Sequence, residues 1–360
     1  MSYTNGLDDP SAYFQTTLYS GTGGSHSITN TGNSDLQPDW VWVKSRSFAA
    51  DHELFDSVRG AGKALISNGN YAESSGRGVN SFDSDGFSIV NAQAATNTSG
   101  QTYTAWQWKA GTSFTNDASA TGIGSIDSAG SVNTDAGFSI CSFTGTGGNG
   151  TVKHGLSTVP KMIIFKNRPQ AEGWIVYHQA ISNTHFLTLN TTGVAVDNAT
   201  MFNDTSPTSS VFSVGSNHGT NGPSHAMIAY CFADVKGYSK FGSYTGNGNA
   251  DGTFVYTGFK PAFVIAKESS EARDWQLWDN KRLGYNASGG NKNLIPNKTD
   301  AEDTYADIDI LSNGFKLRNL SAAANKVSQT YIYMAFAENP FVTSTGVPAT
   351  ARWLCSYLLT

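Results

Sequence analysis

The sequence of 360 residues is poor in charge: Asp, Glu, Lys and Arg make up only 14% of it, and the formal net charge is −5. A dedicated nucleic-acid binder needs a basic surface, so this weakly acidic balance argues against that class. The sequence also has no run of eighteen apolar residues, which argues against a transmembrane helix and membrane insertion. The first residues, 1–6, lack the basic and then apolar pattern of a signal peptide.

Cysteine is scarce as well. The three cysteines, Cys141, Cys231 and Cys355, are odd in number and widely spaced, which fits folding in a reducing cytoplasm. Cys231 lies in an apolar stretch, 228–232, where we expect a buried free thiol. Helical periodicity is almost missing, whereas glycine is abundant, with 38 residues. This composition is typical of a turn-rich, all-β protein with an uncharged polar surface.

One short unit occurs three times in the chain. In each copy a proline stands six residues before a lysine, a ring residue follows the lysine by eight, and an Asp or His follows it by twelve. The prolines are Pro38, Pro160 and Pro261, and the lysines are Lys44, Lys166 and Lys267. The ring residues are His52, Trp174 and Trp275, and the closing residues are Asp56, His178 and Asp279. Three spacings held in three copies indicate an internal repeat.

The unit predicts two paired strands. Proline suits the first residue of a strand because it cannot donate to the ladder. The run after each proline is apolar on both alternating faces, as in a strand buried on both sides. We expect the lysine to return the chain to water, and the ring residue to begin the second strand. Later in each copy come a phenylalanine strand and a strong final strand with an alanine. These residues are Phe87, Phe212 and Phe315, and Ala105, Ala229 and Ala335.

Each copy of about 100 residues would hold seven or eight short strands. The predicted fold is therefore all-β, with three tandem antiparallel β-sandwich repeats of jelly-roll-like size. The repeats span 13–110, 137–235 and 236–340, with an N-terminal arm at 1–12 and a C-terminal tail at 341–360. Segment 111–136 is a Gly/Ser/Thr-rich linker or a surface hairpin.

Candidates for chemistry are weak. Asp83 and Asp85 precede Gly86 as in a calcium loop, but the other ligands are missing. His178 and His185 could approach across a hairpin, yet the other copies carry Asp where His178 stands. An acidic run is typical of a solvated loop, and it consists of Asp300, Glu302, Asp303, Asp307 and Asp309. We therefore predict no catalytic residue, no metal site and no cofactor, and a protein that is not an enzyme.

Aromatic residues are the remaining candidates for ligand binding. If exposed, Trp174, Trp275, Trp278 and Tyr177 would form a platform for sugar rings; if buried, they are core. Their fixed spacing favours the core. The loops 193–207 and 286–305 differ most among the copies, so a receptor would bind there.

Several motifs together resemble a known family. They are a Thr-Gly-Thr-Gly turn at 144–147, His-Gly-Leu at 154–156, Pro-Lys-Met-Ile-Ile at 160–164, Lys-Asn-Arg at 166–168 and the strand 174–178. With the ending at 337–352, they resemble tail and fibre-type virion proteins of bacteriophages, especially marine ones. The resemblance covers 13–352, while 353–360 departs from it and could be an added docking strand.

The resemblance implies a non-catalytic structural protein of the virion, in a tail fibre or another tail-associated position that could face a receptor. Alternatives are a capsid decoration protein, a glycan-binding module and a polysaccharide depolymerase. The implied partners are other virion proteins, and a host surface glycan could be a further one. The implied location is the particle surface after assembly in the host cytoplasm. A homotrimer is favoured, although three repeats in one chain could themselves mimic a trimer.

Overall fold

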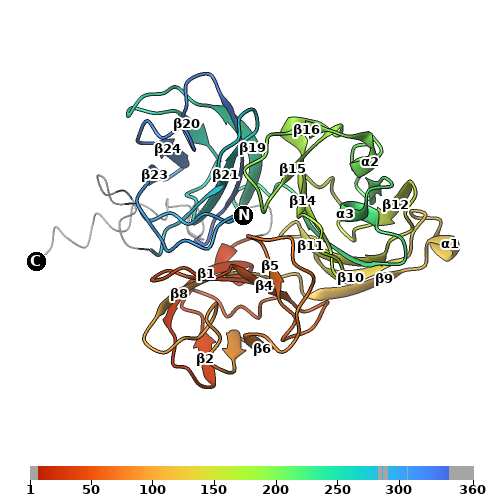
Figure 1. Cartoon of the computed structure of the whole chain (residues 1–360), viewed down its shortest axis with the longest axis horizontal. Coiled ribbons are helices and arrows are strands. Elements are labelled where there is room, and N and C mark those ends of the chain that lie inside the picture. The colour runs from red at the N-terminus through yellow and green to blue at the C-terminus, as the bar shows by residue number, and fades with distance from the viewer. Residues whose placement is uncertain (1–6, 283–285, 287–290, 306, 340–360) are drawn as a thin grey trace, which may run out of the picture.

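The computed structural model describes residues 7–282, 286, 291–305 and 307–339. These residues form an almost entirely β structure in which three lobes surround a common centre (Figure 1). The antiparallel all-β sandwich architecture predicted from the sequence is confirmed. The predicted arm and tail fall largely on 1–6 and 340–360, outside the described residues.

The first lobe is a five-stranded sheet facing a three-stranded one. The large sheet has the order β1 (Phe14–Ser20), β8 (Thr102–Trp108), β3 (Trp40–Ser45), β4 (Glu53–Asp56) and β5 (Leu65–Ile66). The small sheet has the order β2 (His26–Thr29), β7 (Gly86–Ile89) and β6 (Val79–Asp83). A 3-10 turn, η1 (Pro10–Ala12), precedes β1.

The second lobe repeats this order and adds strands at both edges of its large sheet. That sheet runs β16 (Val196–Asp197), β15 (His185–Thr188), β14 (Ile175–His178), β13 (Met162–Asn167), β18 (Ala226–Phe232), β11 (Phe138–Thr144), β10 (Ser128–Asn133) and β9 (Thr112–Asn116). The small sheet pairs β12 (Gly150–Lys153) with β17 (Val211–Val214). Short helical turns are α1 (Ala118–Thr121), η2 (Gln179–Ile181), α2 (Ala199–Phe202) and α3 (His218–Asn221). Segment 111–136 is thus a hairpin, β9–β10, that extends this sheet beyond β11.

The third lobe has the same pairing. Its large sheet runs β19 (Ser239–Thr245), β25 (Thr330–Phe336), β21 (Phe263–Glu268) and β22 (Gln276–Asp279). Its small sheet runs β20 (Phe254–Tyr256), β24 (Gly314–Leu317) and β23 (Ile308–Leu311). The division into three repeats with the stated boundaries stays a prediction, which this common pairing scheme supports.

Strand register identifies equivalent residues in the three lobes. Lys44 lies opposite Thr104, Lys166 opposite Ile228 and Lys267 opposite Ile332. The residue after each of these partners is Ala105, Ala229 and Tyr333. Equating Ala335 with the other two alanines was therefore wrong by two residues.

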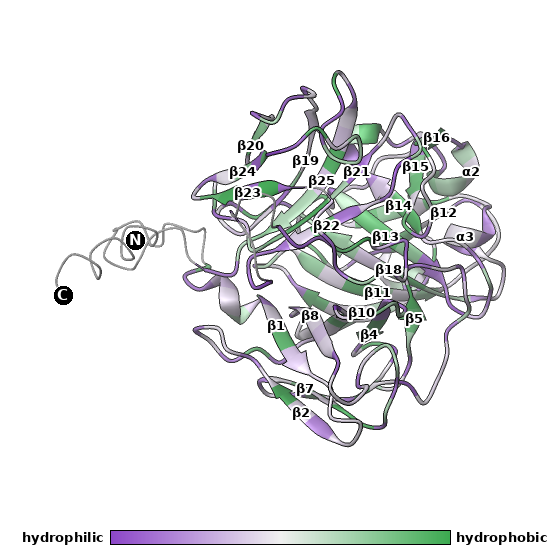
Figure 2. Ribbon diagram, turned by 60° about the vertical axis from the view of Figure 1, so that its left-hand side comes forward, coloured by the Kyte–Doolittle hydropathy of each residue, from purple (hydrophilic) through white to green (hydrophobic). Residues whose placement is uncertain are grey.

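Each large sheet is buried on both faces, which explains its apolar runs. One face packs on the small sheet of its own lobe, giving a separate core in each sandwich. The other face contributes to one central cluster shared by all three lobes. Rings meet pairwise there: Trp40 and Tyr230 have centroids 4.7 Å apart, and Trp108 and Phe263 5.4 Å. Figure 2 shows hydrophobic strands inside and hydrophilic loops outside.

Candidate functional site

The recurring lysines are buried, so the prediction that they return the chain to water was wrong. Lys44 Nζ donates to the carbonyls of Ser45 (2.8 Å) and Thr299 (3.1 Å), the latter in the third lobe. Lys166 Nζ donates to Glu172 O (2.6 Å), Gln170 O (3.2 Å) and Asn70 O (3.4 Å), the last in the first lobe. Lys267 Nζ donates to Glu268 O. Carbonyls take the place of water around each ammonium, and burial lowers the pKa of each lysine to about 8.

The ring residues tie each lobe to a neighbour. Trp174 Nε1 donates to Ile66 O in the first lobe (2.8 Å), and Trp275 Nε1 donates to Thr188 O in the second (3.1 Å). His52 Nε2 lies 3.1 Å from Ile295 O in the third lobe. The core role expected for these tryptophans is confirmed, because Trp174, Trp275, Trp278 and Tyr177 are all buried. They therefore form no platform for sugars.

Two of the closing residues are carboxylates, and each has an arginine partner in its own lobe and a hydrogen-bond donor from a neighbouring lobe. Asp56 pairs with Arg59, three residues on, and accepts a hydrogen bond of 2.6 Å from Tyr230 OH in the second lobe. Asp279 pairs with Arg282 at 2.7 Å and accepts one of 3.0 Å from Trp106 Nε1 in the first lobe. Both ion pairs are fully buried.

His178 makes the corresponding contacts without charge. Its Nδ1 accepts from Ala180 N (3.2 Å), so Nε2 carries the proton and donates to Tyr333 O in the third lobe (3.3 Å). Ile181 stands where the other lobes have arginine, and Met334 stands at the register position of Tyr230 and Trp106. A carboxylate here would lack both its cation and its donor. The three replacements therefore form one consistent set.

Peripheral ion pairs join the lobes too. Arg46 binds both carboxylate oxygens of Glu302 at 3.0 Å, and Arg168 binds both of Glu73 at 2.9 Å. Glu302 of the acidic run is thus a contact between lobes rather than a solvated residue. Part of the 286–305 loop, predicted above to bind a receptor, also joins the first and third lobes, because Ile295 O and Thr299 O bind His52 and Lys44. We call the lysines, ring residues and closing residues, with their partners, the lobe junctions.

The other candidates have local roles. Asp83 accepts from Ser81 and Ser88, and Asp85 accepts from Leu36 N, so both carboxylates serve turns. His185 bonds Thr184 Oγ1 rather than His178. In the part of the chain that the structure describes, no group of three or more His, Cys, Asp or Glu is placed to hold a metal. Nor does any described helix have the length and apolar character needed to cross a membrane.

The described cysteines are buried free thiols, as expected for Cys231. Burial raises the pKa of the Cys141 thiol to about 12, and the pKa of Cys231 is also well above its usual value. The thiolate is the reactive form, so these positions are unreactive. Cys355 lies outside the described residues.

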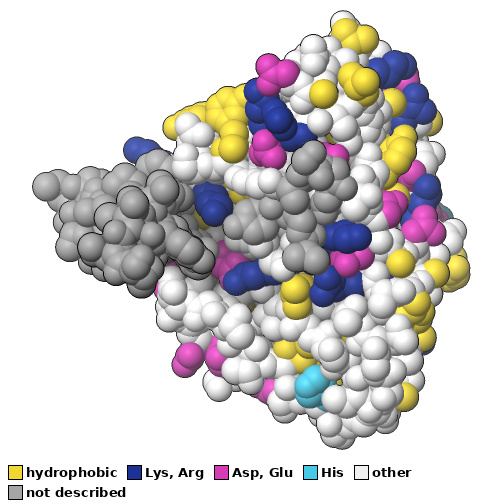
Figure 3. All heavy atoms as spheres, turned by 90° about the vertical axis from the view of Figure 1, so that its left-hand side faces the viewer, with side chains coloured by type: hydrophobic (Ala, Val, Ile, Leu, Met, Phe, Trp, Pro, Cys, Tyr) yellow, Lys and Arg dark blue, Asp and Glu magenta, His cyan; other side chains and the backbone are white. Residues whose placement is uncertain are grey.

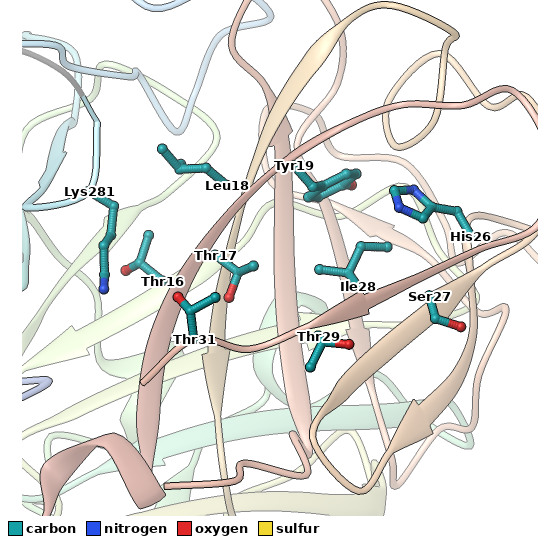
Figure 4. A pocket seen from close by; sticks show the side chains of 10 residues that line it. All are labelled: Thr16, Thr17, Leu18, Tyr19, His26, Ser27, Ile28, Thr29, Thr31 and Lys281. Atoms are coloured by element: carbon teal, nitrogen blue, oxygen red, sulfur yellow. The ribbon is translucent and has the colours of Figure 1, made fainter. Parts of the chain in front are cut away.

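A cavity of about 350 Å³ opens between β1 and β2 in the first lobe (Figure 4). Hydroxyl side chains dominate its lining, and Lys281 of the third lobe reaches it. The lining residues are Thr16, Thr17, Leu18, Tyr19, His26, Ser27, Ile28, Thr29, Thr31 and Lys281. Among the described residues, Thr16 Oγ1 and His26 Nδ1 belong to lining residues but are themselves inaccessible to water, and they have no hydrogen-bond partner. No motif in the sequence pointed to this cavity.

The outer face of β20 carries an exposed aromatic pair. Phe254 is 44% exposed and Tyr256 65%. Val255 pairs with the phenylalanine that is equivalent to the partners of Ile28 and Val152, so these three residues correspond. The positions that correspond to Phe254 and Tyr256 are therefore Ser27 and Thr29 in the first lobe, and Thr151 and Lys153 in the second. The fold therefore does not require aromatic residues here. Figure 3 shows exposed hydrophobic and basic side chains side by side on the face of the molecule it views.

A family model described as "Domain of unknown function (DUF7483)" matches residues 9–340. No curated protein matches the chain.

Proposed function

Since the chain belongs to the DUF7483 family, whose description states no activity, we propose a function from its residues: it is a non-catalytic structural protein of a bacteriophage virion, in a tail fibre or another tail-associated position. One observation carries the proposal. The residues that recur most strictly in the sequence are buried in the lobe junctions and hold the three lobes together.

The junctions suit a particle component because they close a ring. The first lobe contacts the second through Asp56 and Tyr230, the second contacts the third through His178, and the third contacts the first through Asp279 and Trp106. Each contact is buried and hydrogen-bonded, so breaking one leaves polar groups unpaired. A closed ring of this kind resists local opening, which a protein on the outside of a particle needs.

The location in the particle is the decisive test. We expect mass spectrometry of purified phage particles to detect the protein, and immunogold labelling to place it on the tail. Labelling over the capsid surface would favour the alternative of a capsid decoration protein. Absence of the protein from purified particles would refute both.

The closed ring of three lobes also affects which oligomeric state we expect. Three lobes closed around one centre can take the place of a trimer within a single chain, the alternative to the predicted homotrimer. Light scattering of the purified protein separates the two, because a homotrimer has three times the mass of the chain. A clean monomer at micromolar concentration would refute the homotrimer.

A second candidate function, host glycan binding, is favoured by the outer face of β20. Residues two apart on a strand stand about 7 Å apart on one face, so Phe254 and Tyr256 present two rings side by side. Gly314 lies opposite Tyr256 and has no side chain to cover the ring, while Lys316 lies opposite Phe254. Lys316 pairs with Asp251 at 2.5 Å, which supplies polar groups beside the rings. Flat apolar rings flanked by polar groups suit a saccharide.

The variant F254S/Y256T tests the glycan function, because it copies the first lobe's Ser27 and Thr29 and should fold normally. We expect the wild-type protein to bind host envelope glycans on an array, and the variant to lose that binding with an unchanged melting temperature. Equal binding by both proteins would refute the assignment to β20. Release of reducing sugar from the envelope would instead support the depolymerase alternative.

A further inference from the structure

We propose that the cavity between β1 and β2 is an acceptor groove for an extended strand of a partner protein. The first lobe would be completed there in the way that the second lobe is completed by its own segment 125–133. This inference stands independently of the virion role.

Register shows that the two places correspond. Phe14 and Phe138 lie opposite Trp108 and Phe232, which are themselves equivalent residues of the final strands. β1 is therefore the counterpart of β11, and Tyr19 the counterpart of Phe143. In the small sheets, Ile28 and Val152 pair with equivalent phenylalanines, so β2 is the counterpart of β12.

In the second lobe the groove between β11 and β12 is filled. Ser125 N and Ile126 N donate to Thr151 O at 2.8 and 3.1 Å, which binds the segment to the edge of β12. β10 then pairs with β11 from Ser128, opposite Phe143, to Asn133, opposite Phe138. The Ile126 side chain is buried in the sandwich core together with Phe143 and Val152.

In the first lobe the same groove is the cavity. Tyr19 and Ile28, the counterparts of Phe143 and Val152, line it. No strand among the described residues pairs with the free edge of β1, which ends its sheet. Backbone groups on such an edge can accept an added strand.

The second lobe also indicates the chemistry of the occupant. A bulky apolar side chain is needed at the position of Ile126, to lie beside Tyr19 and Ile28. A small residue is needed four positions later, because a Cβ on Gly130 would meet Ile140 O at 1.9 Å. Thr16 is the counterpart of Ile140, so the same limit applies in the first lobe. The partner is therefore an extended segment with an apolar anchor followed by small and hydroxyl residues.

A labelled peptide with the sequence of residues 124–133 serves as the probe against the full-length protein. We expect saturable binding, with Kd below about 1 mM. The peptide with Ile126→Asp should bind at least about tenfold more weakly, a loss of about 1.4 kcal/mol. Hydrogen exchange of the backbone amides in β1, residues 14–20, should slow when the peptide binds.

The protein variant H26W enlarges a side chain that lies on the same face of β2 as Ile28 and lines the groove, so it should abolish peptide binding. S75Y, which adds a ring at an exposed position of the first lobe that does not line the cavity, should leave binding unchanged. No saturable binding to the wild-type protein, or binding without slower exchange in β1, would overturn the proposal, and the exchange test holds even if H26W unfolds. Self-association that H26W abolishes would assign the groove to a second copy and overturn the partner assignment.

Discussion

The substitution His178→Asp tests whether each lobe junction works as a matched set, in which the closing residue, the residue three positions later and the facing residue of the neighbouring lobe depend on one another. It places a carboxylate where the first and third lobes have Asp56 and Asp279, but without the arginine three residues on. Ile181 supplies no cation, and Met334 supplies no hydrogen-bond donor. An uncompensated buried charge costs about 3–5 kcal/mol, so we expect H178D to lower the free energy of unfolding by about that amount.

Adding the missing partners should restore stability in steps. In H178D/I181R the new guanidinium takes the place of Arg59 and Arg282, which also donate to Leu54 O and Leu277 O. We expect it to recover at least about 2 kcal/mol, because the buried carboxylate is paired again. A further M334Y supplies a hydroxyl like that of Tyr230 and should add about 1 kcal/mol.

The assay is urea unfolding of the wild-type protein, both single variants, the double variant and the triple variant that adds M334Y. I181R alone replaces a half-buried apolar side chain with an unpaired cation and should also destabilise, so the cycle isolates the interaction between the introduced carboxylate and the introduced guanidinium. A coupling energy below about 0.5 kcal/mol would refute the matched-set reasoning, since independent sites add within that margin.

Individual contacts lead to three further predictions. Burial lowers the pKa of His178 from 6.5 to about 4, so the neutral ring stabilises the fold fully above pH 6.5. This stabilisation is lost as the pH falls towards 4, at about 1.4 kcal/mol per pH unit. H178Q should therefore show a shallower fall of melting temperature between pH 7 and 4.5 than the wild-type protein, and an equal slope would contradict this. W174F leaves Ile66 O unpaired, whereas W40F breaks no hydrogen bond because no described residue accepts from the Trp40 indole N–H. W174F should therefore lower the free energy of unfolding by about 1–3 kcal/mol more than W40F. Equal losses of stability in thermal unfolding would count against the role of this bond. F254S/Y256T should leave the melting temperature unchanged, and a drop of several degrees would show that the aromatic pair is structural.

Local patterns predicted much of the fold. The prolines mark the starts of β3, β13 and β21, and apolar runs on both faces predicted strands buried on both sides. Fixed spacing of the tryptophans predicted their burial. These features depend on residues close in sequence, which is why the sequence reveals them.

The junctions depend on contacts that the sequence cannot show. A lysine after a strand normally reaches water, and Lys44 is buried only because Thr299, 255 residues away, presents a carbonyl to it. The sequence shows that His178 stands where the other two copies have Asp. The reason for this difference appears only in the structure, where Ile181 and Met334 take the places of the arginine and the hydrogen-bond donor. The cavity between β1 and β2 was missed because its four threonines and one serine resemble an ordinary polar strand edge.

Ring closure has a consequence for synthesis on the ribosome. The first lobe leaves the ribosome with Trp42 and Trp106 on a face that Phe263 and its neighbours later cover. At about 5–20 residues per second, the roughly 190 residues between Trp108 and Thr299 take about 10–40 s to translate. During that interval the nascent chain carries an uncovered aromatic face, so we expect chaperones to engage it until the last lobe emerges.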